Sequence, residues 1–378
     1  MNNFRLKTRQ DIEDFLTGCA FYGTGGGGDT KVGRMCLNKC LEQGMDITLM
    51  DPANVDDEAI FCSAFFMGSI APATDEVLAD MKKNGYNELK YELEDILIGA
   101  VRNLEAYIGK KIDGLIVAEP GGSNTACCMA AAYKMGLPVL NGDPNGRAIP
   151  ETVQGSHAIK GYNGLPAVYF DGWGNCSITT DAFAYHAMER IGKYMSQASY
   201  GVMGEAAYVM TGKEAKEILI PYSLSKVLEV GRAINQSIAR GEDPLSAAAK
   251  ASGGKVVGKG ALHSISTENH EGYYWGTYYI KGMDAYEGNE YRIWFKNENH
   301  ILWVNGIPHT TSPDLITIVN YETGTPVLNS YLKEGDPVGI IINPSHELYM
   351  CDRAIEVFGP RAFGFDFDYV PYDRANAV

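Results

Sequence analysis

Three carboxylates in this chain stand beside glycine-rich segments, where a side chain can reach a bound molecule. Asp29 ends the run Gly-Thr-Gly-Gly-Gly-Gly-Asp, Glu119 begins Glu-Pro-Gly-Gly-Ser-Asn, and Asp143 closes Asn-Gly-Asp. Carboxyl groups at one site can take a proton from water and return a proton to a leaving group. The sequence therefore predicts acid–base chemistry, with Asp29 or Asp143 as the base and Glu119 as its partner.

The same segments supply candidate binding groups. Backbone N–H groups of consecutive glycines can surround a developing negative charge, and an arginine can anchor a substrate carboxylate. The positions expected to contact a ligand are Gly26, Gly27, Gly28, Gly121, Gly122, Ser123, Asn124, Arg147 and Glu151. Plain structural explanations stay open, because Asp29 is a favourable helix N-cap and the segment after Glu119 can be an ordinary turn. Asp143, Arg147 and Glu151 can also form a local ion-pair network.

A dinucleotide site is the obvious alternative for the first glycine run. Gly23, Gly25 and Gly28 satisfy G-x-G-x-x-G, and Asp51 lies a suitable distance further on. That fingerprint requires a strand before the glycines, whereas a helical pattern precedes them here. The charge of Asp29 would also repel a pyrophosphate at the start of the following helix. Nucleotide binding is kept only as an alternative function.

The sequence does not predict a metal site, a cofactor or a covalent nucleophile. Seven histidines are dispersed, and His263 and His270 are the pair whose spacing comes nearest to that of metal ligands. Eight cysteines are scattered without a C-x-x-C pair, which is typical of buried reduced thiols in a cytoplasmic protein. A Gly-x-Ser-x-Gly elbow is also absent from the sequence.

The elements that must position these residues follow from the hydrophobic pattern. In residues 1–172, short apolar runs alternate with helical patterns, which indicates an α/β domain with a mostly parallel sheet. The expected strands are 45–50, 59–67, 112–118, 137–140 and 167–170, and the expected helices are 11–22, 31–42, 76–83, 88–108 and 125–135. Ligands of such sheets bind beyond the carboxyl ends of the strands, where the Glu119 and Asp143 segments are expected to lie.

The second domain, residues 173–378, has a different character. Helices are expected at 181–195 and 223–238, and the chain then becomes rich in tyrosine and tryptophan. The segments 273–280 and 291–295 predict an antiparallel hairpin. Further strands are expected at 300–304, 315–319 and 338–342. This half is therefore predicted to be an α+β domain rich in antiparallel β structure.

Charge and composition narrow the classes of partner. The chain has 378 residues and a formal net charge of −15, with 45% hydrophobic residues. That charge disfavours general binding to nucleic acid or to an anionic membrane. No apolar run approaches the ~18 residues of a membrane span, and the N-terminus has no signal-peptide pattern. We expect a cytoplasmic protein that acts on a small molecule.

Several motifs together resemble a known family. They are Gly-Thr-Gly-Gly-Gly-Gly-Asp at 23–29, Glu-Pro-Gly-Gly-Ser-Asn at 119–124, Gly-Leu-Pro-Val-Leu-Asn-Gly-Asp at 136–143, Gly-Arg-Ala-Ile-Pro-Glu at 146–151, Lys-Asn-Glu at 296–298, Ser-Pro-Asp-Leu-Ile at 312–316 and Gly-Pro-Arg-Ala-Phe-Gly-Phe-Asp at 359–366. In this order they resemble the S-methyl thiohydantoin desulfurase family, which is associated with hydantoin-utilisation and oxoprolinase-type enzymes.

The resemblance implies an α/β domain followed by a β-rich domain, and a substrate with a five-membered imidazolone or hydantoin-type ring. Water would add to the carbon between the two ring nitrogens, and a thiol would leave. An accessory subunit that binds a hydantoinase-type partner protein is the first alternative to a hydrolase. A homo-oligomer is a further expectation that the sequence leaves open.

Overall fold

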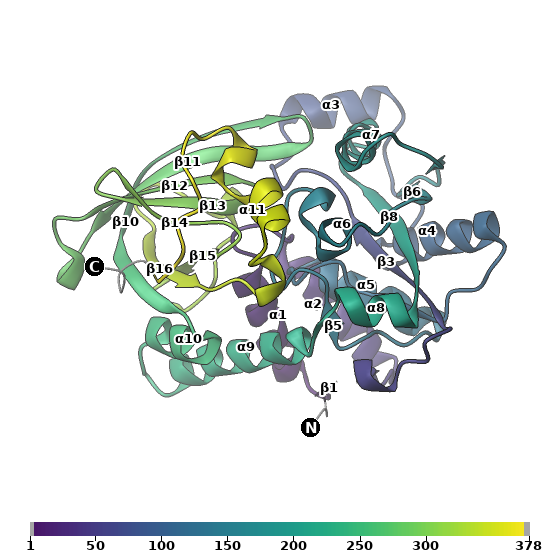
Figure 1. The fold of residues 1–378 in the computed structure, drawn as a ribbon, viewed down its shortest axis with the longest axis horizontal. Coiled ribbons are helices and arrows are strands. Elements are labelled where there is room, and N and C mark those ends of the chain that lie inside the picture. The colour runs from purple at the N-terminus through teal and green to yellow at the C-terminus, as the bar shows by residue number, and fades with distance from the viewer. Residues whose placement is uncertain (1–3, 374–378) are drawn as a thin grey trace.

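The alternating first half of the chain and the β-rich second half build two layered parts that pack against each other (Figure 1). The structure is a computed structural model that describes residues 4–373. The N-terminal part contains a five-stranded sheet in the order β4-β3-β8-β6-β7, and the C-terminal part contains a seven-stranded sheet in the order β14-β13-β12-β11-β10-β16-β15.

The N-terminal sheet is mixed, so the prediction of a mostly parallel sheet was wrong. β3 (Ile60–Phe66) runs parallel to β4 (Gly114–Ile116) but antiparallel to β8 (Met203–Thr211). β8 is also antiparallel to β6 (Ala167–Asp171), which forms a hairpin with β7 (Cys176–Thr179). A short hairpin connection requires antiparallel strands, whereas parallel strands require a long crossover. β7 and β8 both follow residue 172. The sheet is mixed because β7 pairs antiparallel with β6, and β8 pairs antiparallel with β3 and β6.

Next to β4, the chain segments do pair in parallel, as predicted. Met50 bridges Leu140 and Leu115 bridges Val139, both in parallel, so the expected strands around 50 and 140 continue the sheet as single bridges. Two short antiparallel pairs complete this part. They are β1 (Arg5–Leu6) with β2 (Ile47–Thr48), and β5 (Gly142–Asp143) with β9 (Ile220–Pro221).

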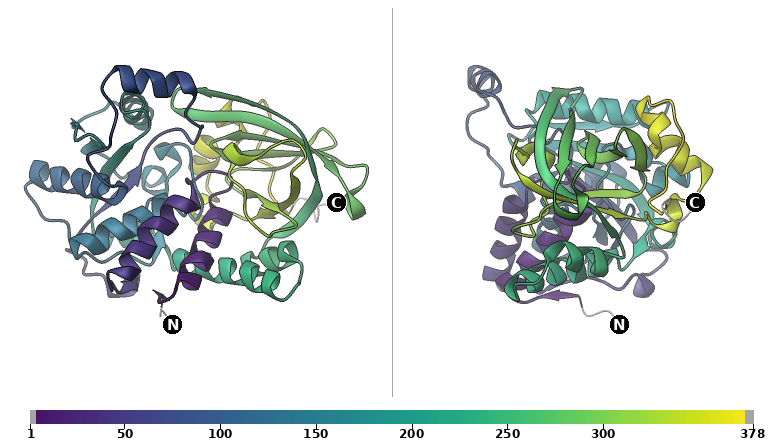
Figure 2. Two further views of the ribbon diagram at one scale, coloured as in Figure 1. Left: turned by 180° about the vertical axis from the view of Figure 1, so that it is seen from behind. Right: turned by 90° about the vertical axis from the view of Figure 1, so that its left-hand side faces the viewer.

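Side chains of β3 alternate between two cores, as expected for a sheet covered on both faces. Cys62 and Ala64 belong to the core that contains α4 and α5, whereas Phe61 and Phe65 belong to the core that contains α7 and α8. Figure 2 shows these layers from behind and from the side. The helices of this part are α1 (Arg9–Tyr22), α2 (Thr30–Glu42), α3 (Asp75–Lys83), α4 (Leu93–Ile108), α5 (Asn124–Met135), α6 (Ser156–Ile159), α7 (Tyr185–Ala198) and α8 (Gly212–Ile218).

The C-terminal sheet is antiparallel throughout its described pairs, as predicted for this domain, and it curls into a half-barrel. Its longest strand has a register shift between Leu262 and Ser264, and such bulges bend and twist a strand. The elements of this part are α9 (Ser223–Ala239), α10 (Pro244–Ser252), β10 (Lys255–His270), β11 (Tyr273–Gly282), β12 (Glu290–Lys296), β13 (Glu298–Val304), β14 (Ile307–Thr311), β15 (Leu315–Asn320), β16 (Pro337–Asn343) and α11 (Asp352–Phe358).

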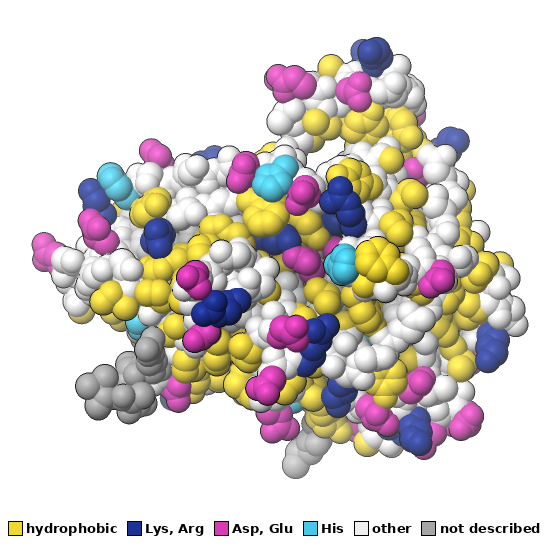
Figure 3. Space-filling view, turned by 45° about the horizontal axis from the view of Figure 1, so that its top comes forward, with side chains coloured by type: hydrophobic (Ala, Val, Ile, Leu, Met, Phe, Trp, Pro, Cys, Tyr) yellow, Lys and Arg dark blue, Asp and Glu magenta, His cyan; other side chains and the backbone are white. Residues whose placement is uncertain are grey.

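The surface carries charges of both signs. In Figure 3, acidic and basic side chains lie side by side on the upper face, and α3 stands off the body of the protein. None of the residues of α3 is buried. No helix within residues 4–373 has both the length and the apolar character needed to cross a membrane.

Candidate functional site

A cavity of about 490 Å³ lies where the two parts of the chain meet. Its N-terminal wall contains residues that follow β3, β4 and the bridge at Leu140, including Met67, Glu119 and Asn145. Its C-terminal wall contains Glu298 and Tyr331. The segments that were predicted to follow the strands therefore lie together at one cavity, and the β-rich domain forms its other wall.

The first glycine run brings three segments into contact. An added Cβ at Gly26 would lie 1.9 Å from Oε1 of Glu298, and one at Gly28 would lie 1.8 Å from Oγ of Ser123. A Cβ at Gly27 would lie 2.7 Å from the Cα of Gly121. The loop therefore allows close approach of backbone and carboxyl groups. Gly27 and Gly28 line the cavity, whereas Gly26 packs behind Glu298.

Replacement of Gly27 by alanine tests this close approach. Gly27 has φ of 74°, and Gly44 has φ of 72° with no atom within 4 Å of an added Cβ. Gly44→Ala should cost about 1 kcal/mol for the left-handed backbone alone. Gly27→Ala should cost about 2 kcal/mol more, because the added methyl overpacks against backbone. Chemical denaturation of both variants measures the difference, and equal losses would contradict the packing argument.

Glu119 is a cavity carboxyl with both oxygens held by hydrogen bonds. It follows β4, and its Oε1 accepts from Nδ2 of Asn124 at 3.0 Å while its Oε2 accepts from the backbone N–H of Ile149 at 2.9 Å. Asn124 in turn accepts from the backbone N–H of Phe66 at 3.0 Å, which fixes its orientation. Burial raises the pKa of Glu119 to about 7, against the lowering effect of these hydrogen bonds and of Lys193. A carboxyl that titrates near neutral pH suits acid–base catalysis.

The raised pKa predicts a pH dependence of stability. Glu119 changes from an ordinary value of 4.5 to about 7 on folding, so the folded state holds a proton that the unfolded state has lost. Stability is therefore full below pH 4.5 and is lost as the pH rises through 7, by on the order of 3 kcal/mol. In Glu119→Gln this loss should disappear. Denaturation between pH 5 and 8 should give a shallower slope for the variant, and parallel slopes would refute the assignment.

Asp29 lies at the mouth of the same cavity and also caps α2. One carboxylate oxygen accepts from the backbone N–H of Lys31 at 2.8 Å, and the other accepts from the hydroxyl of Tyr331. The N-cap interpretation of this residue is therefore confirmed, and it holds together with a position at the cavity. The helix N-terminus that a phosphate would use is already satisfied by this side chain.

Asp143 and Arg147, by contrast, are engaged in structure and do not line the cavity. Asp143 accepts from the backbone N–H groups of Asn145 at 2.7 Å and Gly146 at 2.6 Å and from the hydroxyl of Ser223. Burial raises its pKa to about 6. Arg147 donates to Thr24 Oγ1 and to the carbonyl oxygens of Ala148, Asn299, Pro313 and Asp314. Its guanidinium joins the two parts of the chain.

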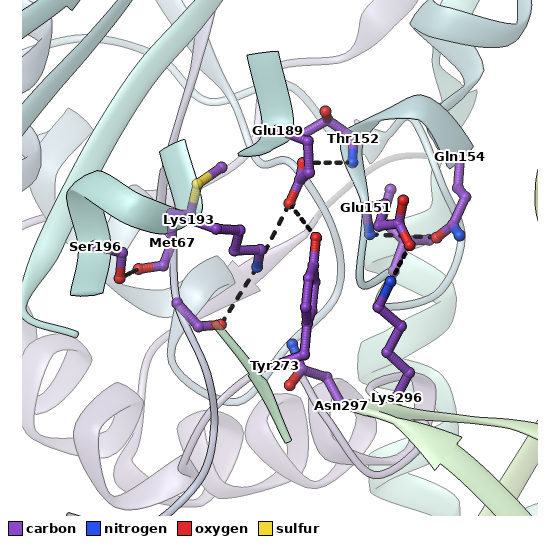
Figure 4. Close-up of polar contacts among 12 residues, drawn as sticks. Met67, Glu151, Thr152, Gln154, Glu189, Lys193, Ser196, Tyr273, Lys296 and Asn297 are labelled. Carbon is purple, nitrogen blue, oxygen red and sulfur yellow. Dashed lines mark hydrogen bonds and ion pairs between the residues drawn. The ribbon is translucent and has the colours of Figure 1, made fainter. Parts of the chain in front are cut away.

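Two buried lysines supply positive charge from either side of one aromatic ring (Figure 4). Lys193 pairs with Glu189 at 3.5 Å and lies 4.3 Å from the ring centroid of Tyr273. Lys296 pairs with Glu151 and lies 4.1 Å from the same centroid. Tyr273 donates its hydroxyl to Glu189 at 3.0 Å. Glu151, expected to bind a ligand, therefore lines the cavity while paired with a lysine.

One end of the cavity has buried polar atoms that lack partners within residues 4–373. They include Nε2 of His157, a residue that lines the cavity. Burial lowers the pKa of His157 to about 3, so its ring is neutral. Unpaired buried polar atoms are costly. A polar ligand or ordered water at this end would therefore be stabilised.

Comparison with known proteins agrees with this architecture. The family model described as S-Me-THD-like, N-terminal domain, matches residues 10–181, and the S-Me-THD-like, C-terminal domain, matches residues 184–372. This chain belongs to the S-Me-THD-like family. The X-ray crystal structure of a protein from Chromobacterium violaceum is similar with a TM-score of 0.74 and 19% identity, covering 97% of this chain and 99% of that one. At that identity the likeness concerns the fold alone. A search of the curated proteins gives no match.

In this S-Me-THD-like chain, sequence reasoning missed the charged residues that close the site. Glu189 and Lys193 lie one turn apart on α7 and read as an ordinary surface pair, yet both are buried. Glu298 lies in a motif that supported the family resemblance, but nothing local indicated that its side chain is buried at the cavity. The helical spacing of the first pair and the Lys-Asn-Glu motif were the available signals.

The expected binding residues of the Glu119 segment also have internal partners. Gly121 donates its backbone N–H to Oγ1 of Thr125 at 2.8 Å, and Ser123 donates its backbone N–H to the carbonyl of Gly27 at 3.2 Å. Gly122 packs against the carbonyl of Gly28. Within residues 4–373, no group of three or more His, Cys, Asp or Glu side chains has an arrangement that could hold a metal ion. His263 and His270 are both exposed on β10.

Proposed function

We propose that this S-Me-THD-like protein hydrolyses a small S-methyl-thiohydantoin-type ring, in which water replaces the sulfur substituent and a thiol leaves. The observation that supports the proposal is Glu119, a buried carboxyl at the cavity whose pKa is raised to about 7. A base with that pKa is half deprotonated at neutral pH, which suits removal of a proton from water. The family to which the chain belongs supplies the substrate class.

The chemistry requires attack at the ring carbon between the two nitrogens. Oxygen of water forms a bond to that carbon while Glu119 takes one of its protons, and the electron pair of the C=N bond moves to a ring nitrogen. Glu119 then returns the proton to that nitrogen. The hydrogen bonds from Asn124 and Ile149 hold both oxygens of Glu119 in place, so little reorganisation is needed during the reaction.

Lys193, rather than Arg147, is proposed to supply positive charge to the substrate. Arg147 donates to five acceptors in the protein and does not line the cavity, whereas Lys193 lines it and has a single carboxylate partner. A buried ammonium group stabilises negative charge that develops on the ring. Asp29, at the cavity mouth, is proposed to orient the entering ring through its carboxylate.

The proposal is tested by incubating the protein with 2-(methylthio)-imidazolone and following release of methanethiol with a thiol reagent. Acyclic S-methylisothiourea is the matched control, because it has the same reacting carbon without the ring. Release from the ring and none from the acyclic compound is the expected result. No release from either compound would contradict the proposal and would favour an accessory subunit.

A further inference from the structure

The proposed hydrolysis leaves the proton of the departing thiol unassigned. An alkyl thiolate is a basic leaving group, so cleavage of its bond to the ring is faster when an acid protonates the sulfur. In that mechanism Glu119 has already passed the proton of water to the ring nitrogen and is a carboxylate when the carbon–sulfur bond breaks, so a different group must supply this proton. The cavity contains a second buried carboxyl that the mechanism above does not use.

That carboxyl is Glu298, which comes from the C-terminal part of the chain. Its side chain lines the cavity and is 2% exposed. Its Oε2 is buried and has no hydrogen-bond partner among residues 4–373. Lys193, which also lines the cavity, is bonded to Glu189 instead. Glu298 therefore brings a carboxyl group with one unpaired oxygen to the cavity wall, from the C-terminal part of the chain.

The backbone around Glu298 is held on both sides. Asn297, with φ of 56°, donates its N–H to the carbonyl of Tyr274 at 2.7 Å and accepts from the N–H of Tyr274 through its own side chain at 2.9 Å. Nδ2 of Asn329 donates to the carbonyl of Asn297 at 2.8 Å. Gly26 packs directly against Oε1 of Glu298. These contacts fix the position of the side chain rather than leaving it free to move in the cavity.

The environment also favours the protonated form of Glu298. Burial raises the pKa of its carboxyl well above the usual value, and the nearby charge of Glu119 raises it further, against the lowering effects of Arg147 and Lys193. Burial raises the pKa of Glu119 to about 7, while its own hydrogen bonds lower it. Two carboxyls at one site whose environments differ in this way are suited to separate acid and base functions.

We propose that Glu298 is the general acid of the reaction and donates its proton to the sulfur as the bond between carbon and sulfur breaks. The electron pair of that bond goes to sulfur, which leaves as methanethiol, and Glu298 becomes a carboxylate. The remaining hydroxyl proton of the adduct passes to Glu119 as the new carbonyl forms, and then to Glu298. One water is consumed for each thiol released. This inference rests on the proposed function.

Leaving-group dependence tests the assignment. Thiol release is measured for wild type, Glu298→Gln and Glu119→Gln with the S-methyl ring and with an S-(2,2,2-trifluoroethyl) ring, whose thiolate is a better leaving group. Glu298→Gln should lower kcat/KM by about 10²–10³ for the S-methyl ring but by less than about 10-fold for the trifluoroethyl ring. Glu119→Gln should lower both to a similar extent, since both substrates require activated water.

The outcomes separate the inference from the function on which it rests. If wild type releases no thiol from either ring, the proposed function itself is contradicted. If wild type is active but Glu298→Gln lowers kcat/KM equally for both rings, only the assignment of Glu298 as general acid is overturned. Product hydantoin should still raise the unfolding temperature of Glu298→Gln, and if that variant does not fold, Glu298→Asp, with its shorter reach, should give the same leaving-group dependence.

Discussion

Glu119→Gln is expected to lower kcat/KM for thiol release by about 10³, within the 10²–10⁴ that a positioned acid–base group supplies. The wild-type profile of kcat/KM against pH should rise with an apparent pKa near 7, because burial raises the pKa of Glu119 to about 7 and the base must be deprotonated. In the variant that rise should be absent. Steady-state thiol release between pH 5.5 and 8.5 measures both effects.

The control for Glu119→Gln is Glu92→Gln. Glu92 is an exposed partner of Lys39 and does not line the cavity. Its replacement should leave kcat/KM and the pH profile unchanged. An active Glu119→Gln variant with the wild-type pH profile would contradict the proposal that this carboxyl is the base.

Arg147→Met should lower the free energy of unfolding by about 4 kcal/mol, because the buried guanidinium is bonded to groups from both parts of the chain. Its removal leaves Thr24 Oγ1 and several buried carbonyl oxygens without that donor. Burial lowers the pKa of Arg147 to about 10, so it remains charged at neutral pH. Arg147→Lys should recover little stability, since an ammonium group cannot span the same acceptors. Chemical denaturation measures these losses.

Arg353→Met is the matched control for the arginine at 147. Arg353 is half exposed and pairs with Glu356 one turn away at 2.8 Å. Such surface pairs contribute less than about 1 kcal/mol. If Arg147→Met were no more destabilising than Arg353→Met, the guanidinium would not join the two parts of the chain.

Part of the site could be predicted because it depends on local sequence. Glu119 follows a buried strand and begins a glycine-rich turn, which places it at a sheet edge whatever the rest of the fold does. The glycine run ending at Asp29 cannot form a helix interior or a strand, so a close-approach loop followed by a capped helix was expected. Both residues do line the cavity.

The remainder depends on contacts between distant segments. Asp143 and Arg147 have residue types suited to catalysis, but Ser223, Asn299 and Pro313, all far along the chain, engage them in structure. β8 was missed because Gly204 and Glu205 interrupt its apolar pattern, although Glu205 is buried at the centre of the sheet. The burial of polar residues is set by tertiary packing, which periodicity does not report.

In the proposed reaction, water attacks the ring carbon and expels sulfur. The most direct test is to run the reaction in H₂¹⁸O and to analyse the ring product by mass spectrometry. The expected products are a hydantoin with one ¹⁸O at the carbon between the nitrogens and one methanethiol for each ring consumed. A product that keeps its sulfur, with ¹⁸O in released methanol, would show attack at the methyl group and contradict the claim.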